Sequence, residues 1–582
     1  MNRKQRRAAA ARRPATTKSA GDSAAQLFAD ALRCQELHRL EDAVRAYKRL
    51  LLVKPDHAAA CNNLACMLQA QGKLHEASAY FARALELTPQ LFNDFGPICA
   101  TLAAILPPLA DAMRSANEAW PSRPPRERLL PGSGLAAIAS DPLLLAILQS
   151  TPVRDVALER ALTALRAVLL EQAGKTAAPA DEATLTLCCA LAQQCFVNEY
   201  VFATTPAEDE RVALLDSALR EATRARAKIP PLQLAAIAMY APLSALPDAQ
   251  NLLDFKWPRA VDGVVTQQLR EPTQERALRS SIPQMTTIDD DVSLRVQQQY
   301  EENPYPRWVH LAGNVEPVTI DDYLRTAIPG AAFVPLDAGE APEVLVAGSG
   351  TGWHPIEMTR KLLGARVLAI DLSLSSLAYA KRKTPAELAA RLSYAQADIL
   401  KLGALDRSFD VIDASGVLHH MAEPMTGLRT LLALLRPGGF MHLALYSELA
   451  RRDVTAARKY VAEKGYRATA DDIRRARQDI LNSNLRSVAR AGDFFSTSDC
   501  RDLLFHVHEH QLTIPQIKSL IAETGTRFIG FAFDPMRARH YAALFAQAGK
   551  STVDLDAWHE FELRNAQTFS GMYEFWIQKP RA

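Results

Sequence analysis

The chain has 582 residues, of which 48% are hydrophobic and 23% are charged, and its formal net charge is +2 at pH 7. This length exceeds one hydrophobic core, because domains usually hold roughly 100 to 200 residues. The small net charge gives no general attraction to nucleic acid or anionic lipid, and no apolar stretch reaches the ~18 residues of a membrane span. We therefore expect several domains, no membrane partner and no nucleic-acid partner.

The N-terminal residues 1–22 are predicted to form a disordered basic tail. Residues 1–21 hold no acidic side chain and no apolar run, so the core of a secretory signal is missing. An organellar transit peptide of similar composition is the alternative. The eight cysteines include no C-x-x-C pair and lie mostly on apolar faces of helix-like segments. This pattern predicts buried free thiols and a reducing cytoplasm.

A repeat of 34 residues occupies the segment 23–125. Leucine, alanine, aromatic and proline residues recur at this period: Leu40 and Leu74, Ala43 and Ala77, Tyr47 and Phe81, Pro55 and Pro89. Paired antiparallel helices need a small residue where they cross and a proline to stop the second helix, and the pattern resembles tetratricopeptide repeats. A third unit near Leu91 is hardly recognisable, so we expect later helices to cover the end of the solenoid.

Residues 126–295 continue with helical patterns, in which apolar residues recur at spacings of three and four. We expect this region to connect the repeats to the rest of the chain. Its apolar surfaces either dock a partner or pack into a core, and both interpretations stay open.

A segment 296–450 begins with an extended aromatic and basic stretch, NPYPRW, from Asn303 to Trp308. Its prolines push the residues before them out of the helical region. We predict that Tyr305, Arg307 and Trp308 form a lid that seals a binding site or contacts the substrate. A structural clamp between domains is the alternative.

The sequence EVLVAGSGTG, which starts at Glu343, joins a short apolar run to a glycine-rich turn. The run predicts a buried parallel strand. Glycine tolerates positive φ and lets the backbone approach a ligand, while the following helix offers unpaired N–H groups. We expect a nucleotide-like ligand at the turn residues Gly348, Ser349, Gly350, Thr351 and Gly352.

Two acids end the next two predicted strands. Asp371 ends ARVLAID, about 20 residues past the turn, where an acid accepts hydrogen bonds from ribose hydroxyls. Asp398 ends SYAQAD and is predicted to accept from an adenine amino group. Leu372 and Ile399 directly follow these acids and complete the predicted cofactor-binding set.

Together with SGVLHHM, the turn RPGG and a last strand-like run GMYEFWIQ, these residues resemble a class I S-adenosylmethionine (SAM)-dependent methyltransferase. The resemblance implies an α/β Rossmann-like fold with a mostly parallel seven-stranded sheet, and SAM as the cofactor. A nicotinamide oxidoreductase would place a third glycine where this chain has Trp353. Methyltransferases often carry an acid three positions into the first strand, where this chain has Val346, so a contact to the methionine part of SAM must come from elsewhere.

Residues 451–524 read as a helical, arginine-rich insertion after the fifth strand, and residues 525–582 as the C-terminal part of the methyltransferase core. The insertion belongs at the same edge of the sheet as the cofactor. We therefore predict that it builds an acceptor pocket or lid, with a solvated helical face as the alternative for most of its charges.

Methyl transfer requires alignment of the acceptor and, for an O–H or N–H acceptor, removal of a proton. Asp413 near the end of the fourth strand, with His419 and His420 beyond it, are the predicted catalytic residues, since histidine is a suitable base at neutral pH. Packing against adenine or capping of a helix is the alternative for the histidines.

The run H-x-H-x-H suggests a metal site. The segment CRDLLFHVHEHQ is expected to be helical, and on a helix only His506 and His510 share a face, without His508. No cysteine or acid cluster shows metal-ligand spacing, so we predict no metal.

The sequence thus predicts a cytoplasmic SAM-dependent methyltransferase whose tetratricopeptide-like region docks a protein or peptide partner. The whole resembles a group of bacterial proteins that join such repeats to a methyltransferase. A non-catalytic adaptor that keeps the SAM-binding fold is the second hypothesis, because fold alone does not decide function. A nicotinamide-dependent oxidoreductase is the third. The methyl acceptor is not specified by the sequence.

Overall fold

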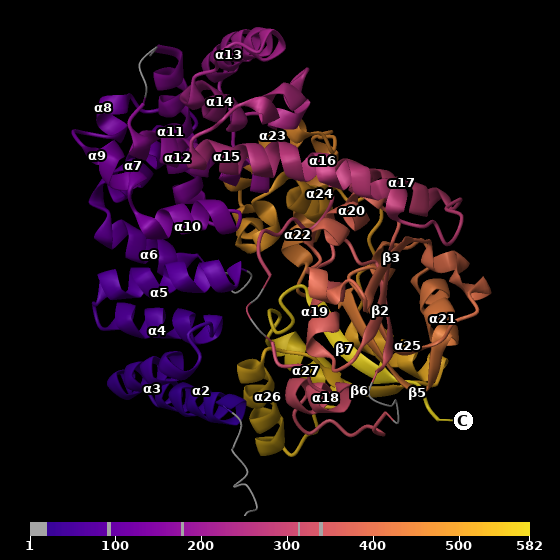
Figure 1. Cartoon of the computed structure of the whole chain (residues 1–582). Coiled ribbons are helices and arrows are strands. Elements are labelled where there is room, and N and C mark those ends of the chain that lie inside the picture. Colours follow the sequence, from indigo (N-terminus) through magenta and orange to yellow (C-terminus); the bar gives the residue numbers. More distant parts are fainter. Residues whose placement is uncertain are drawn as a thin grey trace, which may run out of the picture.

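The computed structural model describes residues 20–89, 95–175, 180–311, 313, 315–336 and 341–581. Most of the predicted basic tail and the predicted start of a third repeat at Leu91 lie outside these residues. Figure 1 shows a stack of helices along one side of the molecule and an α/β domain on the other.

The repeat segment folds into antiparallel helix pairs, as its period predicts. These helices are α2 (Ala20–Glu36), α3 (Leu40–Val53), α4 (Ala58–Ala70), α5 (Leu74–Leu87), α6 (Gly96–Ile105) and α7 (Pro107–Ala119). The repeated small and aromatic residues Ala43, Tyr47, Ala77 and Phe81 are all buried, because the helices cross at these positions. Helices α3 and α5 each end just before the proline of their repeat.

Further helices continue the stack: α8 (Arg126–Leu129), α9 (Gly134–Ala139), α10 (Pro142–Ser150), α11 (Val156–Lys175), α12 (Glu182–Val197), α13 (Pro206–Ala225), α14 (Pro231–Ala238), α15 (Arg259–Val265), α16 (Glu271–Leu278) and α17 (Asp291–Glu302). One hydrophobic core extends through the described residues from Ala24 to Leu269, and α5 packs on α10 while α7 packs on α11. The boundary predicted after residue 125 therefore falls inside a continuous core.

The chain leaves the helical conformation directly after α12. Glu199 and Tyr200 adopt left-handed conformations, with φ of 55° and 60°. Such values are uncommon for residues with side chains, and they persist where surrounding contacts hold the backbone. Glu199 in this turn contacts Arg307 and Ser498, as described below.

The α/β domain contains a seven-stranded sheet in the order β3-β2-β1-β4-β5-β7-β6. Its strands are β1 (Glu343–Ala347), β2 (Arg366–Asp371), β3 (Leu392–Gln396), β4 (Phe409–Ser415), β5 (Leu435–Tyr446), β6 (Arg527–Phe531) and β7 (Met572–Gln578). Strands β1 to β5 run parallel, and β7 pairs antiparallel with β5 and β6. This topology confirms the predicted α/β Rossmann-like, mostly parallel sheet.

Alternate residues of β1 enter cores on opposite faces of the sheet, since side chains in a strand alternate. Val344 and Val346 pack with α18 (Ile320–Ala327), α19 (Trp353–Lys361) and α20 (Leu374–Lys383). Leu345 and Ala347 pack into the core that holds α21 (Pro424–Leu434), α25 (Ile514–Thr524), α26 (Pro535–Gln547) and α27 (Leu555–Arg564). Both faces are covered, as a parallel sheet requires.

The insertion after β5 forms α22 (Arg452–Glu463), α23 (Ala470–Leu481) and α24 (Thr497–Phe505), with a small core of its own. It lies between the helical stack and the sheet (Figure 1). Arg477 on α23 binds both carboxylate oxygens of Glu159 on α11, at 2.8 and 3.1 Å, and both side chains are buried. Trp120 Nε1 also donates to Gln478 Oε1 at 2.9 Å. The insertion is therefore anchored to the stack.

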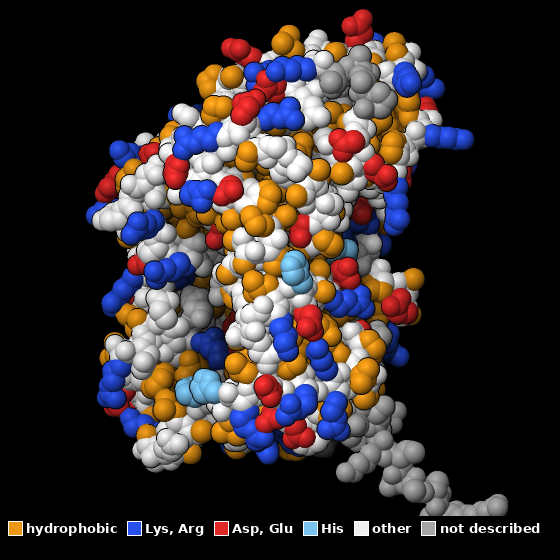
Figure 2. Space-filling view, turned by 90° about the vertical axis from the view of Figure 1, so that its left-hand side faces the viewer, with side chains coloured by type: hydrophobic (Ala, Val, Ile, Leu, Met, Phe, Trp, Pro, Cys, Tyr) orange, Lys and Arg blue, Asp and Glu red, His pale blue; other side chains and the backbone are white. Residues whose placement is uncertain are grey.

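The outer face of the helical stack carries Lys and Arg side chains intermixed with Asp and Glu, without a region of one sign (Figure 2). This mixture agrees with the small net charge of the chain. Among the helices described, none alone has the length and apolar character to cross a membrane, and the pair α6 and α7, bent by 116°, meets both conditions only when taken together.

Candidate active site

A cavity of about 440 Å³ lies at the carboxyl ends of β1, β2 and β4. All but one of the cofactor-binding residues predicted from the sequence line it. The lining residues are Gly348, Ser349, Gly350, Thr351, Asp371, Leu372, Asp398 and Ile399. The exception, Gly352, has φ of 90°, and a Cβ atom there would lie 2.4 Å from the Cβ of Ala380. Gly352 therefore allows the turn to pack closely on α20.

The glycine turn is held by hydrogen bonds to β2. The Gly350 N–H donates to Asp371 Oδ2 at 2.8 Å, and the Ser373 N–H donates to Asp371 Oδ1 at 2.9 Å. Burial raises the pKa of Asp371, and these two bonds oppose that rise. Each carboxylate oxygen keeps a second lone pair, so Asp371 retains acceptors for ligand hydroxyls.

Three buried oxygens in the cavity wall lack a hydrogen-bond partner within the part of the chain that the structure describes. They are Asp398 Oδ2, Ser349 Oγ and Ser376 Oγ. The other oxygen of Asp398, Oδ1, accepts from the Leu400 N–H at 2.9 Å. Buried polar atoms are nearly always paired in folded proteins. These oxygens thus fit a ligand that carries N–H and O–H groups, as SAM does.

Asp413 on β4 places a carboxylate next to the first strand. It lies beside Val346 in the register of β1 and β4. Its Oδ2 lies 2.9 Å from His442 Nδ1 and 3.6 Å from His354 Nδ1, and its Oδ1 accepts from the Ser415 N–H at 3.0 Å. Burial alone would raise the pKa of Asp413, but the charge of His442 and the contact with His354 outweigh it and hold that pKa well below its ordinary value. The carboxylate therefore stays ionised and is a weak base.

The two neighbouring histidines after β4 have different surroundings. His419 does not line the cavity; its ring packs on Tyr446, with centroids 3.9 Å apart, and burial lowers its pKa well below the ordinary value. His420 lines the cavity, and its Nδ1 lies 3.0 Å from the carbonyl oxygen of His508. A carbonyl only accepts, so Nδ1 carries the proton and Nε2 keeps its lone pair. Burial lowers the pKa of His420, which keeps the ring neutral.

The helix expected through the H-x-H-x-H run is wrong beyond Phe505, where α24 ends. His506 is buried against His420, and the His508 N–H donates to His506 Nδ1 at 3.1 Å, which turns the backbone out of the helix. The His510 N–H then donates to the carbonyl oxygen of His419 at 2.8 Å. Tertiary contacts with the loop after β4 therefore override the local helical tendency.

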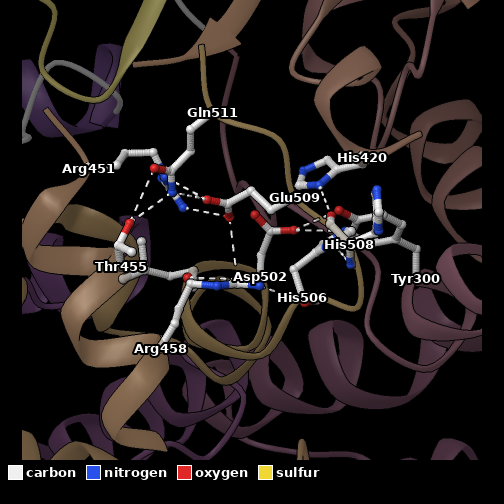
Figure 3. Close-up of polar contacts among 11 residues, drawn as sticks. Tyr300, His420, Arg451, Thr455, Arg458, Asp502, His506, His508, Glu509 and Gln511 are labelled. Carbon is white, nitrogen blue, oxygen red and sulfur yellow. Dashed lines mark hydrogen bonds and ion pairs between the residues drawn. The ribbon is translucent and has the colours of Figure 1, made fainter. Parts of the chain in front are cut away.

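His420, Asp502 and His506 come together with their ligand atoms within 4.8 Å of one another (Figure 3). The rings of His420 and His506 stack with centroids 3.7 Å apart and an angle of 23° between planes. A metal ~2 Å from a nitrogen of each ring would therefore lie far out of both ring planes. His506 Nδ1 also accepts the His508 N–H, which leaves the ring proton on Nε2. Burial lowers the pKa of His506 to about 2, so the ring is neutral. This geometry argues against a metal at the cluster.

The predicted lid residues lie directly on the glycine turn. Trp308 Nε1 donates to the Thr351 carbonyl oxygen at 3.1 Å, and the Thr351 hydroxyl donates to the carbonyl oxygen of Pro306. A Cβ atom on Gly350 would lie 2.8 Å from the Tyr305 carbonyl oxygen. Trp308 is buried, and Tyr305 lines the cavity.

The same segment is tied to the helical stack. Arg307 Nε lies 3.0 Å from Glu199 Oε1, in the left-handed turn after α12. The other carboxylate oxygen of Glu199 accepts the Ser498 N–H, at the start of α24, at 2.6 Å. A second cavity, of about 710 Å³, shares Arg307 and Trp308 with the first. This segment thus contacts the glycine turn, as the lid interpretation expects, and also the helical stack, as the clamp interpretation expects.

Sequence reasoning missed four residues that line the first cavity: Arg154, Tyr300, Tyr446 and Asp502. Arg154 precedes α11 and Tyr300 lies on α17, while Asp502 lies on α24. Tyr446 ends β5. Sequence reasoning did not single them out, since they come from four segments that meet only in the folded chain.

Comparison with known proteins agrees with this geometry. Residues 345–443 match the family described as Methyltransferase domain, and residues 57–97 match Tetratricopeptide repeat. An uncharacterized protein of Synechococcus is 28% identical over 202 residues, which cover 33% of this chain and 48% of that protein. The demethylmenaquinone methyltransferase of Clavibacter sepedonicus is 33% identical over 129 residues, with coverage of 22% and 50%. The ubiquinone biosynthesis O-methyltransferase of Albidiferax ferrireducens is 30% identical over 149 residues, with coverage of 25% and 58%.

The chain spans about half the length of these curated relatives. Among solved structures, PKMT2 from Rickettsia typhi in complex with AdoHcy has a TM-score of 0.35 and 18% identity, and the match covers 44% of this chain and 52% of that one. The family matches confirm the resemblance stated from the sequence. The chain contains a SAM-dependent methyltransferase domain joined to a tetratricopeptide-repeat region.

Proposed function

We propose that the whole chain is an active enzyme that transfers the methyl group of SAM to an acceptor docked by its helical stack. The observation that carries the proposal is the meeting, in one cavity, of the unpartnered Asp398 and Ser349 oxygens with the lone pair of His420. When bound, SAM supplies a methyl group on a positively charged sulfur, which a nucleophile attacks in line.

Each residue has a distinct role in this proposal. Asp371 accepts from the ribose hydroxyls, and Asp398 accepts from the adenine amino group beside Leu372 and Ile399. Asp413 places a fixed negative charge near the methionine part, because its pKa is held low. His420 takes the acceptor proton through Nε2. His419 packs behind it and supports Tyr446.

The helical stack is proposed to dock a protein or peptide. Support comes from the tetratricopeptide match and from two residues of the stack: Arg154 lines the cavity, and Glu199 holds the lid segment. A cytoplasmic location belongs to the same proposal, since all eight cysteines are free, and free thiols persist in a reducing compartment.

The test measures both cofactor binding and methyl transfer. SAM and NADH are titrated into the full chain by calorimetry, and SAM with a labelled methyl group is added to a cell lysate that is then fractionated into protein, RNA and small molecules. We expect SAM but not NADH to bind, and label to enter the protein fraction. Asp371→Asn is the matched variant and should bind SAM more weakly, because it replaces one carboxylate acceptor by an NH₂ donor and removes the charge with little change in size.

Two results would change the proposal. SAM binding without label in any fraction supports the adaptor alternative. Binding of NADH in place of SAM supports the oxidoreductase.

A further inference from the structure

The cavity has a second group of lining side chains that the cofactor assignments do not use. It consists of Tyr300 on α17, Tyr305 in the lid segment, Tyr446 at the end of β5, His420 and Asp502. The group, hereafter the acceptor subsite, joins the helical stack, the methyltransferase core and the insertion. It is the place where a methyl acceptor meets the cofactor, if the function proposed above holds.

The acceptor subsite presents hydrogen-bond acceptors. His420 Nε2 has a free lone pair, because Nδ1 is committed to the His508 carbonyl oxygen. Asp502 is a carboxylate, and its Oδ1 accepts from the Tyr300 hydroxyl at 2.6 Å. That bond also uses the one proton of Tyr300. Nitrogen and carboxylate atoms of His420 and Asp502 lie within 4.8 Å of each other, so one small group can contact both.

The charge around the subsite favours a cation. Figure 3 shows Glu509 between Arg451 and Arg458, so this carboxylate and these two arginines are engaged with one another. Asp502 is different: among the described residues it has no ion pair with Lys or Arg, although the more distant charge of Arg451 also interacts with it. The Nε2 of the neutral His506 lies 4.0 Å from its Oδ1.

One cation, Arg154, also lines the cavity. Its charge acts on Asp493 and Asp499, two further buried carboxyl groups of the insertion, but burial still raises the pKa of both, that of Asp499 to about 8. Arg154 therefore interacts with carboxyl groups other than Asp502.

The Arg451 guanidinium lies 3.6 Å from the centroid of the Tyr446 ring, and His419 packs on the same ring, so Tyr300 and Tyr305 are the tyrosines left to face a ligand. We propose that the methyl acceptor is a primary aliphatic amine, held as an alkylammonium beside the rings of Tyr300 and Tyr305. An ammonium has three N–H donors and satisfies His420 Nε2 and Asp502 together, whereas a hydroxyl has one O–H and leaves one acceptor unpaired. Aromatic faces attract a cation, and the carboxylate supplies the opposite charge. The inference rests on the proposed function and adds the class of the reacting atom.

The reaction step follows from these positions. His420 Nε2 takes one proton from the ammonium, which frees a lone pair on nitrogen. The lone pair forms the new N–C bond while the bond from the methyl carbon to sulfur breaks, and that electron pair stays on sulfur. The product is a methylammonium beside Asp502, and His420 returns its proton to water.

The test uses n-butylamine and n-butanol, which match in chain length and differ in the terminal group. Each is titrated into the full chain loaded with S-adenosylhomocysteine. We expect butylamine to bind at least tenfold more tightly than butanol. Asp502→Asn should abolish this preference while the affinity for SAM stays within twofold, which also shows that the variant is folded. Tyr300→Phe is the matched variant: it keeps the ring and the carboxylate, so most of the preference should remain.

Labelled products provide a second readout. Methyl groups transferred from SAM should resist alkaline hydrolysis and appear on amino groups after acid hydrolysis. Equal binding of butanol, a preference unchanged in Asp502→Asn, or label on oxygen or carbon would overturn the amine assignment while the methyltransferase function stands. Absence of SAM binding or of any transfer would refute the proposed function itself.

Discussion

Gly350→Ala tests whether the lid segment and the cofactor turn form one unit. Gly350 has φ of 50°, and an added Cβ atom would lie 2.8 Å from the carbonyl oxygen of Tyr305. That oxygen belongs to the backbone, so it cannot rotate away as a side chain would. Gly465 provides a matched control, since its φ is 68° and nothing lies within 4 Å of an added Cβ atom.

The expected losses of folding stability and of SAM affinity follow from the contacts at the turn. Both variants lose about 1 to 2 kcal/mol of folding stability, because a side chain disfavours the left-handed conformation. Gly350→Ala also displaces the lid segment and breaks two hydrogen bonds, from Trp308 to Thr351 and from Thr351 to Pro306. Each hydrogen bond contributes about 1 kcal/mol, so the loss of both costs about 2 kcal/mol more than the strain alone. If SAM binds only with the lid segment in place, this free energy lowers the affinity for SAM about 30-fold.

Urea denaturation measures the stability of both variants, and calorimetry measures their affinity for SAM. We expect similar SAM affinity for Gly465→Ala and the parent chain, and the 30-fold loss for Gly350→Ala alone. SAM affinity equal in the two variants would refute the coupling of lid and turn.

Three further predictions concern the anchoring, charge and specificity of the site. Glu159→Gln leaves Arg477 buried without its counter-charge and should lower the free energy of unfolding, measured in urea, by about 3 to 5 kcal/mol. The control Glu463→Gln, at the exposed pair with Lys459, should lower it by less than about 1 kcal/mol. Equal losses in the two variants would contradict the anchoring role of Glu159. Because the pKa of Asp413 is lowered in the folded chain, its carboxylate stabilises the fold above the unfolded pKa of ~3.9, and this contribution is lost as the pH falls below that value toward the folded pKa. The stability difference between the parent and Asp413→Asn should therefore shrink below about pH 4, and a constant difference down to pH 2 would count against the pairing. Asp398→Asn should reduce the preference for S-adenosylhomocysteine over S-inosylhomocysteine about tenfold in calorimetry, since only adenine carries an exocyclic amino group that donates to the Asp398 carboxylate. An unchanged ratio would show that Asp398 does not contact this amino group.

The cofactor half of the site was predictable because its signals are local. A buried strand, a glycine turn and an acid at the next strand end occur within short stretches, and parallel strands bring their carboxyl ends to one edge. The antiparallel last strand was predictable only through the family resemblance. Val346, where related chains often have an acid, gave no hint that Asp413 lies beside it in the neighbouring strand.

The acceptor subsite was not predictable, because its residues meet through packing between distant segments. Asp502 lines the cavity from α24 of the insertion, which is anchored to the helical stack through contacts such as Arg477 with Glu159. The helix expected through His506 ends early for the same kind of reason, since burial against His420 outweighs local propensity. Trp308 was expected to form either a lid or a clamp between domains, and it is buried, so its truncation would also cost core packing.

The order of strands in the sheet has a consequence for biosynthesis. Within the described part of the chain, β6 pairs only with β7, and β7 also covers the open edge of β5. Helices α26 and α27 are translated after β6 and before β7. During that interval a nascent chain carries β5 and β6 with unpaired edges, which are the surfaces that nucleate aggregation. A weakened β7 should therefore reduce the yield of folded protein more than the activity of the molecules that complete the sheet.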